Sequence, residues 1–249
     1  QSIFFILDRW NMFGGTPRKF EQLCDSLGPN VHRVESSKLS IKRLLQQKGA
    51  TIIITTFNRP LAIGLLVKLL KPRVKVIHNY VNLDELRFME IGLRVVAELL
   101  NVQFVVPSKA VASIKGLSKY RVIPNGVRFK TLTTIRSENS RLFTIGGLNH
   151  YKNHEVIIRA LPYLDGFILD IYGEGPLEEY LRNLSINLGV SDRVNFHGYL
   201  DNDLISFSGI YIHSSVSEGF GNAVCEALGN GSRFLLSDIS VNHELFAYQ

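Results

Sequence analysis

One segment near the end of the chain places two carboxylates around a glycine-rich turn. In Glu218-Gly-Phe-Gly-Asn-Ala-Val-Cys-Glu226 the two acidic residues are eight positions apart, and the β-branched and aromatic run Ile210–His213 precedes them. This pattern predicts a strand, a tight turn and a helix, which puts Glu226 on nearly the same face as the helix start. The backbone N–H groups at such a helix start bind anions. The segment therefore suits a ligand in which hydroxyl-rich groups flank a phosphate, which is the shape of a nucleotide-sugar.

The elements that must position this segment follow from alternating apolar runs and helical patterns in the second half of the chain. Short runs rich in β-branched residues predict strands, and apolar spacings of three and four predict helices. Strands are expected at Leu142–Gly146, Phe167–Tyr172, Arg193–Phe196, Ile210–His213 and Phe234–Ser237, and helices at His154–Leu164, Leu177–Leu188, Leu204–Ser208, Asn222–Leu228 and Asn242–Ala247. In the second of these helices the apolar stripe Leu177, Leu181, Leu184 and Leu188 is expected to be core.

The first half of the chain shows the same alternation. Strands are expected at Ser2–Asp8, Val31–Val34, Thr51–Thr56, Val74–His78, Val102–Pro107 and Tyr120–Ile123, and helices at Pro17–Leu27, Leu39–Gln47, Ala62–Leu70, Glu85–Leu100 and Ser108–Gly116. Strands that alternate with helices predict a parallel, doubly wound sheet of the α/β class.

A break between the halves divides the chain into two predicted domains. The turn signal Pro124–Gly126 precedes the polar stretch Lys130–Ser140, which is typical of an interdomain connection. We expect an N-terminal, acceptor-side Rossmann-like domain over residues 1–128 and a C-terminal, nucleotide-sugar-binding one over residues 129–249. Two such domains would leave a cleft between the carboxyl edges of their sheets, where open α/β folds bind ligands.

The charge is distributed unequally between these halves. Residues 1–130 carry 21 Lys and Arg against 8 Asp and Glu, whereas residues 131–249 carry 7 against 14. The overall charge of +6 thus combines a basic and an acidic half. A basic domain suits an anionic lipid surface, a phosphorylated partner or nucleic acid, although ordinary solvated helix faces would give the same count.

Composition also bears on the compartment. No apolar run reaches the roughly 18 residues that span a bilayer, and Ile3–Leu7 is too short for a signal peptide. The two cysteines, Cys24 and Cys225, fall at apolar positions of predicted helices. Buried free thiols are expected there rather than a disulfide, which suits a reducing, cytoplasmic setting. No Cys and His cluster has the spacing of metal ligands.

Five motifs in order resemble the group 1 glycosyltransferases, which are retaining enzymes of the GT-B fold. The resemblance rests on Arg121–Val127, Ile145–Asn153, Tyr172–Leu177, Arg193–Tyr199 and Ser214–Glu226. The first domain resembles the family more loosely, through Gly14 and Gly15 after the first strand and through His78 after a later one.

The resemblance implies roles for particular residues. Lys152, on the loop that carries Gly146 and Gly147, would hold the donor diphosphate, and Glu218 would accept hydrogen bonds from sugar hydroxyls. Backbone N–H groups of Gly219, Phe220, Gly221 and Asn222 would contact the sugar and distal phosphate, while Glu226 would bind the ribose. Tyr199 would lie beside the base, His78 near the transferred sugar, and Gly14 and Gly15 near the phosphate and acceptor.

Five of these residues also have an ordinary structural explanation. Lys152 would then be a solvated loop lysine, Glu218 a helix-start residue favoured by the helix dipole, and Glu226 a surface charge. Likewise Tyr199 would be a core tyrosine, and His78 a histidine satisfied within a turn.

The sequence departs from the family at Gly147, where the family usually has an arginine that clamps phosphate. Asp201-Asn-Asp203 matches the Asp-x-Asp pattern of metal-dependent sugar transferases. Because it precedes the predicted helix Leu204–Ser208, N-capping explains it better. We therefore expect no metal.

Together these features predict a retaining, hexosyltransferase-type glycosyltransferase. Its donor would be a nucleoside-diphosphate-sugar of the UDP or GDP type. The acceptor would be a glycan or a lipid-linked, anionic glycan at the inner membrane face. A non-catalytic nucleotide-sugar or glycan-binding protein on the same fold is the alternative, since Gly147 replaces an arginine and the chain ends before the family's final bracing helix. Nothing beyond net charge indicates a nucleic-acid partner.

Overall fold

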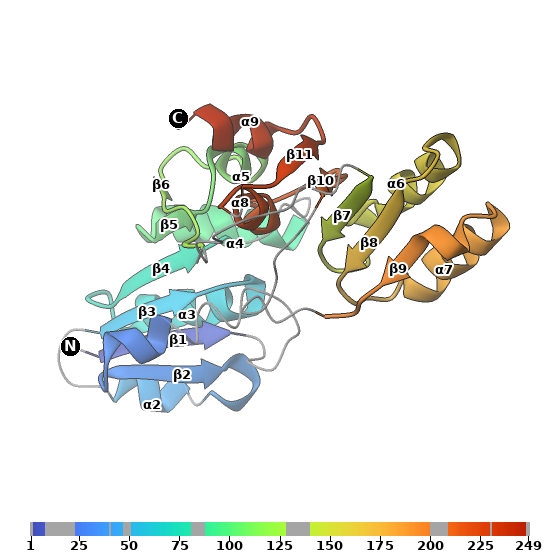
Figure 1. Cartoon of the computed structure of the whole chain (residues 1–249). Coiled ribbons are helices and arrows are strands. Elements are labelled where there is room, and N and C mark those ends of the chain that lie inside the picture. Colours follow the sequence, from blue (N-terminus) through green and yellow to red (C-terminus); the bar gives the residue numbers. More distant parts are fainter. Residues whose placement is uncertain are drawn as a thin grey trace. The chain divides into compact units, whose positions relative to one another are not determined.

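A computed structural model describes residues 2–7, 23–39, 41–46, 51–80, 88–127, 140–199, 209–229 and 231–247. The chain divides into two compact units, Gln1–Pro124 and Asn125–Gln249, which we call the first and second units (Figure 1). Gly14, Gly15, Asp201–Asp203 and the expected helix Leu204–Ser208 lie outside the described residues.

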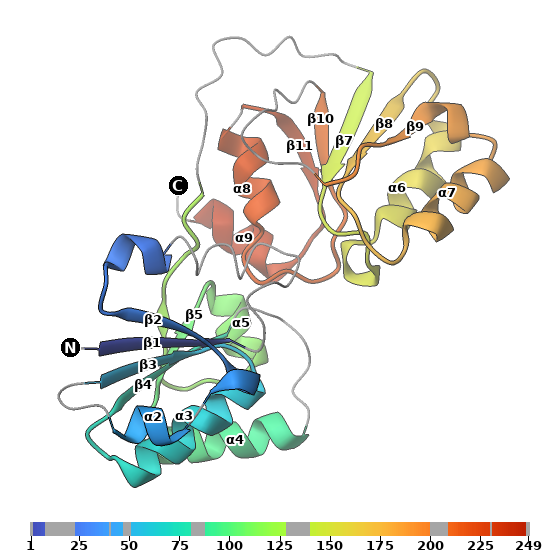
Figure 2. The same ribbon diagram turned by 90° about the horizontal axis from the view of Figure 1, so that it is seen from below.

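The first unit is built on a six-stranded parallel sheet in the order β2-β1-β3-β4-β5-β6. Its strands are β1 (Ser2–Leu7), β2 (Val31–Glu35), β3 (Thr51–Thr55), β4 (Lys75–Asn79), β5 (Gln103–Val106) and β6 (Arg121–Val122). Its helices are α2 (Ile41–Leu45), α3 (Asn58–Leu70), α4 (Phe88–Leu99) and α5 (Lys109–Ile114), and residues 23–27 are also helical. Figure 2 shows α2, α3 and α4 on one face of this sheet.

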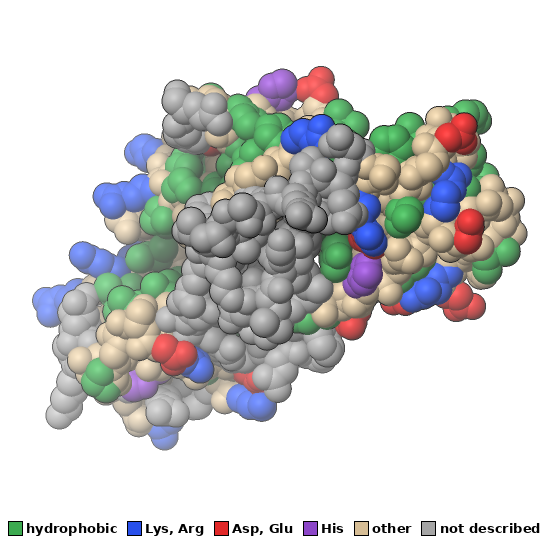
Figure 3. Space-filling model, in the orientation of Figure 1, with side chains coloured by type: hydrophobic (Ala, Val, Ile, Leu, Met, Phe, Trp, Pro, Cys, Tyr) green, Lys and Arg blue, Asp and Glu red, His purple; other side chains and the backbone are tan. Residues whose placement is uncertain are grey.

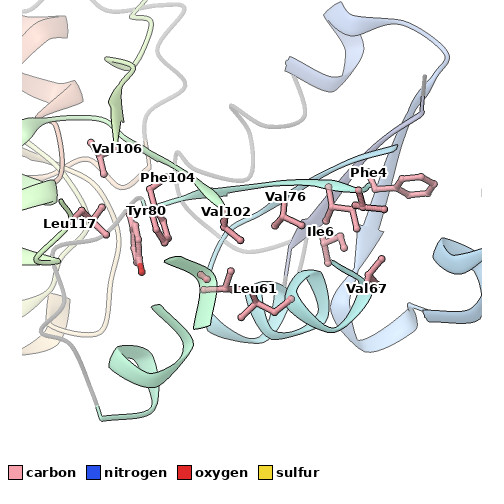
Figure 4. Close-up of a cluster of buried hydrophobic side chains, with 14 of the residues drawn as sticks. Phe4, Ile6, Leu61, Val67, Val76, Tyr80, Val102, Phe104, Val106 and Leu117 are labelled. Carbon is pink, nitrogen blue, oxygen red and sulfur yellow. The ribbon is translucent and has the colours of Figure 1, made fainter. Parts of the chain in front are cut away.

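Alternating side chains of the strands bury both faces of this sheet, as parallel sheets require. Phe4 and Ile6 of β1 join the main core with Leu61 and Val67 of α3 (Figure 4). Phe5 and Leu7 point the other way and pack against Cys24. Because the side chains of β1 alternate between the two faces of the sheet, this apolar strand contributes to two cores.

Helix α3 begins at Asn58, four residues before the predicted start at Ala62. Pro60 lies in its first turn, where backbone N–H groups have no partner within the helix. Because a proline there forfeits no hydrogen bond, the Asn-Arg-Pro sequence does not delay the helix.

The second unit has a five-stranded parallel sheet in the order β11-β10-β7-β8-β9. Its strands are β7 (Arg141–Ile145), β8 (Ile168–Tyr172), β9 (Val194–Phe196), β10 (Ile210–His213) and β11 (Arg233–Leu236). Its helices are α6 (His154–Ala160), α7 (Glu178–Asn187), α8 (Asn222–Gly229) and α9 (Ser240–Ala247). The two described α/β units confirm the predicted fold class.

Two cores lie on opposite faces of this sheet, with α6 and α7 over one face and α8 and α9 over the other (Figure 2). The stripe of α7 is core as predicted: Leu181 and Leu184 are buried, and Leu177 and Leu188 pack against the same cluster. Helix α6 stops at Ala160 rather than Leu164, and a 3₁₀ turn follows, because Pro162 has no N–H to continue the helix.

Neither Cys24 nor Cys225 forms a disulfide, but only Cys24 is buried. Cys225 is half-buried because its neighbours on α8, Val224 and Ala227, point into the core and leave it on the flank of the helix. Among the described residues, no helix is both long and apolar enough to cross a bilayer.

Candidate functional site

The second sheet reverses its strand order between β7 and β10. From β7 the chain adds β8 and β9 on one side, and then β10 and β11 on the other. Segments that leave the carboxyl ends of these two neighbouring strands diverge, and open α/β sheets bind ligands at this point. Lys152 follows β7 and Glu218 follows β10, so the topology brings these two predicted residues to one edge.

The ammonium of Lys152 donates a hydrogen bond to Glu218 Oε1 and forms an ion pair with it. Two hydrogen bonds to backbone carbonyls hold the two loops together. Ser214 Oγ donates to the carbonyl of Lys152 at 2.8 Å, and the N–H of Val216 donates to the carbonyl of Tyr151 at 2.8 Å. Both charged side chains are largely buried, at 16% exposed for Lys152 and 11% for Glu218.

Three side chains surround the carboxylate of Glu218. Besides Lys152, Ser215 Oγ donates to Oε1 at 2.8 Å and His213 Nε2 lies 3.4 Å from the same oxygen. Burial opposes ionisation of Glu218, but the hydrogen bonds from His213, Lys152 and Ser215 and the charge of Lys152 outweigh it and lower its pKa to about 2. Glu218 is therefore a fixed acceptor near neutral pH.

His213 itself is anchored from behind. Its Nδ1 lies 3.2 Å from Asn242 Nδ2 on α9 and 3.3 Å from Ser237 Oγ after β11. The roles of these three residues could not be predicted from the sequence, because neither Ser237 nor Asn242 belongs to a motif. The one sequence signal was that His213 ends the strand directly before the Glu218 loop.

Two glycines permit the loop around Lys152. A Cβ on Gly146 would lie 3.1 Å from Cε of Lys152, so the lysine stem crosses over this glycine. A Cβ on Gly173, which has φ +146°, would lie 1.9 Å from the carbonyl oxygen of Gly146. Only glycine allows the β8 loop this close to the β7 loop. The N–H of Leu148 donates to the carbonyl of Glu174 at 3.0 Å and closes the contact.

Gly147, where the family usually has arginine, has room for a side chain. A Cβ there would meet Asn149 Nδ2 at 3.1 Å and the carbonyl oxygen of Glu174 at 3.7 Å. The first contact is with the end of a side chain, which can shift. Packing therefore does not require glycine at this position.

The turn after Glu218 leads into α8, as predicted. Gly219 and Phe220 are half-buried, Gly221 has φ +82°, and the helix begins at Asn222. Such a helix start presents backbone N–H groups to the same edge.

Glu226 is half-buried on α8, so it is not a simple surface charge. Burial, together with the negative charges of Glu218 and Glu226, raises the pKa of Tyr211 well above its ordinary value. Both carboxylates therefore act on the one buried ring of β10. The ribose contact of Glu226 stays a prediction.

Tyr199 is 60% exposed, so the alternative that it is a core tyrosine is wrong. Its backbone N–H donates to Glu174 Oε1 at 3.2 Å, and Gly198 pairs with Gly173 in an isolated bridge. Tyr199 is thus tied through its backbone to the loop beside Leu148. Its place beside a base stays a prediction.

His78, in the first unit, is buried within its own core. Its Nδ1 lies 2.9 Å from Thr55 Oγ1, and its ring packs edge-on against Tyr80 with centroids 4.5 Å apart. Burial and the charge of Lys115 lower its pKa to about 3, so the ring is neutral. The ring is therefore satisfied, although it lies within strand β4 rather than in a turn, and the contact with a sugar stays a prediction.

No three His, Cys, Asp or Glu side chains of the described ranges come close enough together to hold a metal ion. The Asp-x-Asp sequence at Asp201–Asp203 lies outside those ranges.

Relatives among curated proteins are glycosyltransferases. The chain is 26% identical over 130 residues to an uncharacterized glycosyltransferase of Methanocaldococcus jannaschii, which covers 49% of this chain and 33% of that protein. It is 23% identical over 223 residues to the N-acetylgalactosamine-N,N'-diacetylbacillosaminyl-diphospho-undecaprenol 4-alpha-N-acetylgalactosaminyltransferase of Campylobacter jejuni, which covers 80% and 61%. The chain thus spans less than two thirds of the length of these relatives.

Solved structures share the fold over nearly the whole chain. Anabaena HepE in complex with UDP aligns with a TM-score of 0.77 at 15% identity, over 98% of this chain and 83% of that one. Sucrose-phosphate synthase from Thermosynechococcus elongatus aligns with a TM-score of 0.77 at 16% identity, over 96% and 82%. The fold is therefore GT-B.

A family model described as "Glycosyl transferases group 1" matches residues 130–248, which cover almost all of the second unit. This match includes both loops of the Lys152 and Glu218 pair. Over these residues the chain is similar to the group 1 glycosyltransferase family.

Proposed function

We propose that the second unit binds a nucleoside-diphosphate-sugar of the UDP or GDP type, and that the protein transfers the sugar to an acceptor hydroxyl with retention. The observation that carries this proposal is the pairing of Lys152 with Glu218 at the strand-order reversal, beside the start of α8. A cation, a carboxylate and helix N–H groups at one edge match the phosphate and the hydroxyls of such a donor.

In this mechanism Lys152 exchanges its carboxylate partner for the donor diphosphate. Its charge then stabilises the diphosphate as the bond to the sugar breaks. Glu218, ionised because its pKa is about 2, accepts hydrogen bonds from sugar hydroxyls. The N–H groups of residues 219–222 face the sugar and distal phosphate, and Glu226 accepts from the ribose. No residue in this scheme requires a metal ion.

Several relatives support a nucleotide-sugar donor. Anabaena HepE was solved with UDP-glucose, and the pneumococcal O-GlcNAc transferase GtfA with UDP and GlcNAc. Retention is supported by the five motifs that resemble retaining enzymes of this family.

For the acceptor, we propose a lipid-linked or other anionic glycan at a membrane surface. The Campylobacter relative acts on a diphospho-undecaprenol sugar, and two Rhizobium meliloti relatives are lipopolysaccharide core biosynthesis glycosyltransferases. The charge of the first unit fits such a partner. Residues 58–80 and 99–127 contain nine Lys or Arg and no Asp or Glu.

The ends of α3 and α4 and the loops before β4 and β6 form a mixed surface at the amino edge of the first sheet, where β4, β5 and β6 begin. Exposed leucines end the adjacent helices: Leu70 of α3 is 58% exposed and Leu99 of α4 is 77% exposed. Arg73 and Lys119 are exposed in the loops before β4 and β6. Figure 3 shows hydrophobic and basic side chains next to one another over this part of the unit, at the left of the view. Each basic residue near an anionic bilayer contributes about 1 kcal/mol.

Three measurements test the transfer. Thermal shift with UDP, GDP and their sugars should identify the donor, and transfer or hydrolysis of that donor should fall at least 100-fold in Lys152→Ala and Glu218→Ala. The anomeric configuration of the product, read by NMR, decides retention. Nucleotide-sugar binding without turnover on any acceptor would instead indicate a binding protein.

Sedimentation with vesicles tests the membrane contact independently. Vesicles that contain phosphatidylglycerol should bind the protein at low salt, while pure phosphatidylcholine vesicles should not. The charge-removing Arg73→Gln/Lys119→Gln variant should weaken binding, and the control Arg182→Gln in the second unit should not. Binding to neither vesicle type would remove the membrane from the proposal, and equal binding to both would remove the anionic lipid.

A further inference from the structure

We propose that His213 is a positioning residue, which Asn242 of α9 holds with its ring proton on Nε2 so that it fixes the carboxylate of Glu218 toward the sugar. This inference rests on the proposed donor site, but its principal test does not require activity.

The orientation of Asn242 follows from one carbonyl. Its Nδ2 lies 2.8 Å from the backbone oxygen of Ser237, which can only accept a hydrogen bond. The side-chain nitrogen must therefore face Ser237, because the reversed amide would place two oxygens together. The second hydrogen on Nδ2 is free to point at His213 Nδ1, which lies 3.2 Å away.

The tautomer of His213 follows from that orientation. Asn242 Nδ2, which lies beside Nδ1, can only donate a hydrogen bond, so Nδ1 must accept from it. The single hydroxyl proton of Ser237 goes to the carbonyl of Ser215 at 2.6 Å, so Ser237 Oγ, 3.3 Å from Nδ1, does not donate to the ring. Nδ1 is then the acceptor, and the ring proton lies on Nε2, which faces Glu218 Oε1 at 3.4 Å.

The surroundings keep this arrangement fixed. His213 and Asn242 are each 4% exposed, so water offers no ready substitute partner. The titratable groups near the ring come from three elements: Glu218 and Tyr211 flank it on the β10 segment, Lys152 lies after β7, and His154 begins α6. Glu218 alone among them accepts from Nε2.

The role becomes necessary once a donor is bound. When Lys152 turns to the diphosphate, Glu218 loses its strongest partner. Ser215 and His213 then remain to hold the carboxylate in its rotamer. His213 differs from Ser215 because it transmits the position of α9 to the site. Helix α9 therefore supports the donor site although it does not contact the ligand.

Nitrogen NMR of the histidine ring tests the tautomer directly. In the wild-type protein, long-range proton–nitrogen correlations should show an unprotonated Nδ1 and a protonated Nε2 for His213, with and without UDP or GDP. In Asn242→Asp a carboxylate replaces the donor beside Nδ1, so Nδ1 should carry a proton. A wild-type ring with its proton on Nδ1, or one that exchanges between both tautomers, would overturn the proposal.

Binding measurements test the positioning role. Since Glu218 would contact only the sugar, Asn242→Ala and His213→Leu should weaken UDP-glucose or GDP-mannose about ten-fold, as expected for one lost hydrogen bond to a charged group. The affinity for UDP or GDP alone should change less than two-fold. His213→Gln, which retains an N–H donor, should recover part of the loss.

Asn195→Ala is the matched control, because Asn195 donates to Asp170 elsewhere in the same unit. It should leave the ratio of sugar-nucleotide to nucleotide affinity unchanged. Equal weakening of nucleotide and sugar nucleotide in Asn242→Ala would mean a merely structural role. If no nucleotide bound at all, the proposed function would be wrong. NMR would still decide the tautomer of His213 independently.

Discussion

The ion pair between Lys152 and Glu218 should couple the stabilities of two loops that are 66 positions apart in the sequence. The pKa of Glu218 falls from 4.5 to about 2, despite burial that opposes ionisation. A shift of this size corresponds to about 3 kcal/mol in favour of the folded state. Because His213 and Ser215 contribute to this stabilisation as well as Lys152, we expect a Lys152–Glu218 coupling free energy of about 1–2 kcal/mol.

A double-mutant cycle with Lys152→Met and Glu218→Gln measures that coupling. Native-state hydrogen exchange of the buried β8 amides is the suitable assay, because it reports the unfolding of the second unit separately from the first. Lys152→Met should destabilise the unit, since it leaves Glu218 charged and largely buried. The double variant should recover much of the loss.

The exposed pair Arg182–Glu178, with N and O 2.7 Å apart on α7, is the matched control. Its cycle should give no more than about 0.5 kcal/mol. Because the folded-state pKa of Glu218 is lowered, its contribution is complete above about pH 4.5 and is lost as the pH falls toward 2. A Lys152–Glu218 coupling as small as the control's, or one unchanged as the pH falls through this range, would refute the reasoning.

Three further substitutions test the site. Gly173→Ala should lower the free energy of unfolding of the second unit by at least about 2–3 kcal/mol, because its Cβ would meet the carbonyl of Gly146 at 1.9 Å. Hydrogen exchange measures this loss. The control Gly166→Ala, in open space at φ +74°, should lower it by only about 1 kcal/mol. Gly147→Arg should tighten UDP or GDP binding about ten-fold by calorimetry, and Gly147→Gln should not; no gain would mean that this position does not face the phosphates. Glu226→Gln should weaken binding of UDP or GDP about ten-fold. The variant should also bind the ribonucleotide and the 2′-deoxynucleotide equally well. If the variant still preferred the ribonucleotide, the ribose would lie elsewhere.

Most strands of both units could be predicted from the sequence to within one or two residues. Apolar runs such as Thr51–Thr55 are buried on a parallel sheet, and local pattern alone reports that burial. Helix ends were harder, because they depend on single residues. Pro60 permits a helix start and Pro162 ends a helix, and only the position within the turn separates these effects.

The candidate site could be predicted in part. Glu218, Lys152 and the glycine turn stand out because their types and spacing are specific to a motif. His213, Ser237 and Asn242 could not be found, because a buried polar contact between distant segments leaves no periodic signal. For His78, a histidine at a strand end looks the same in the sequence whether its ring faces a ligand or, as here, Thr55 and Tyr80.

The sequence by itself determined the α/β class, the basic first half, the family resemblance and the glycine turn before α8. These depend on composition and on residues close together in the chain. The tertiary structure decided that Lys152 and Glu218 pair, that Asn242 supports His213, and that His78 is enclosed in its own unit. Those contacts join segments brought together by strand order, and strand order is set by packing of whole elements rather than by any local pattern.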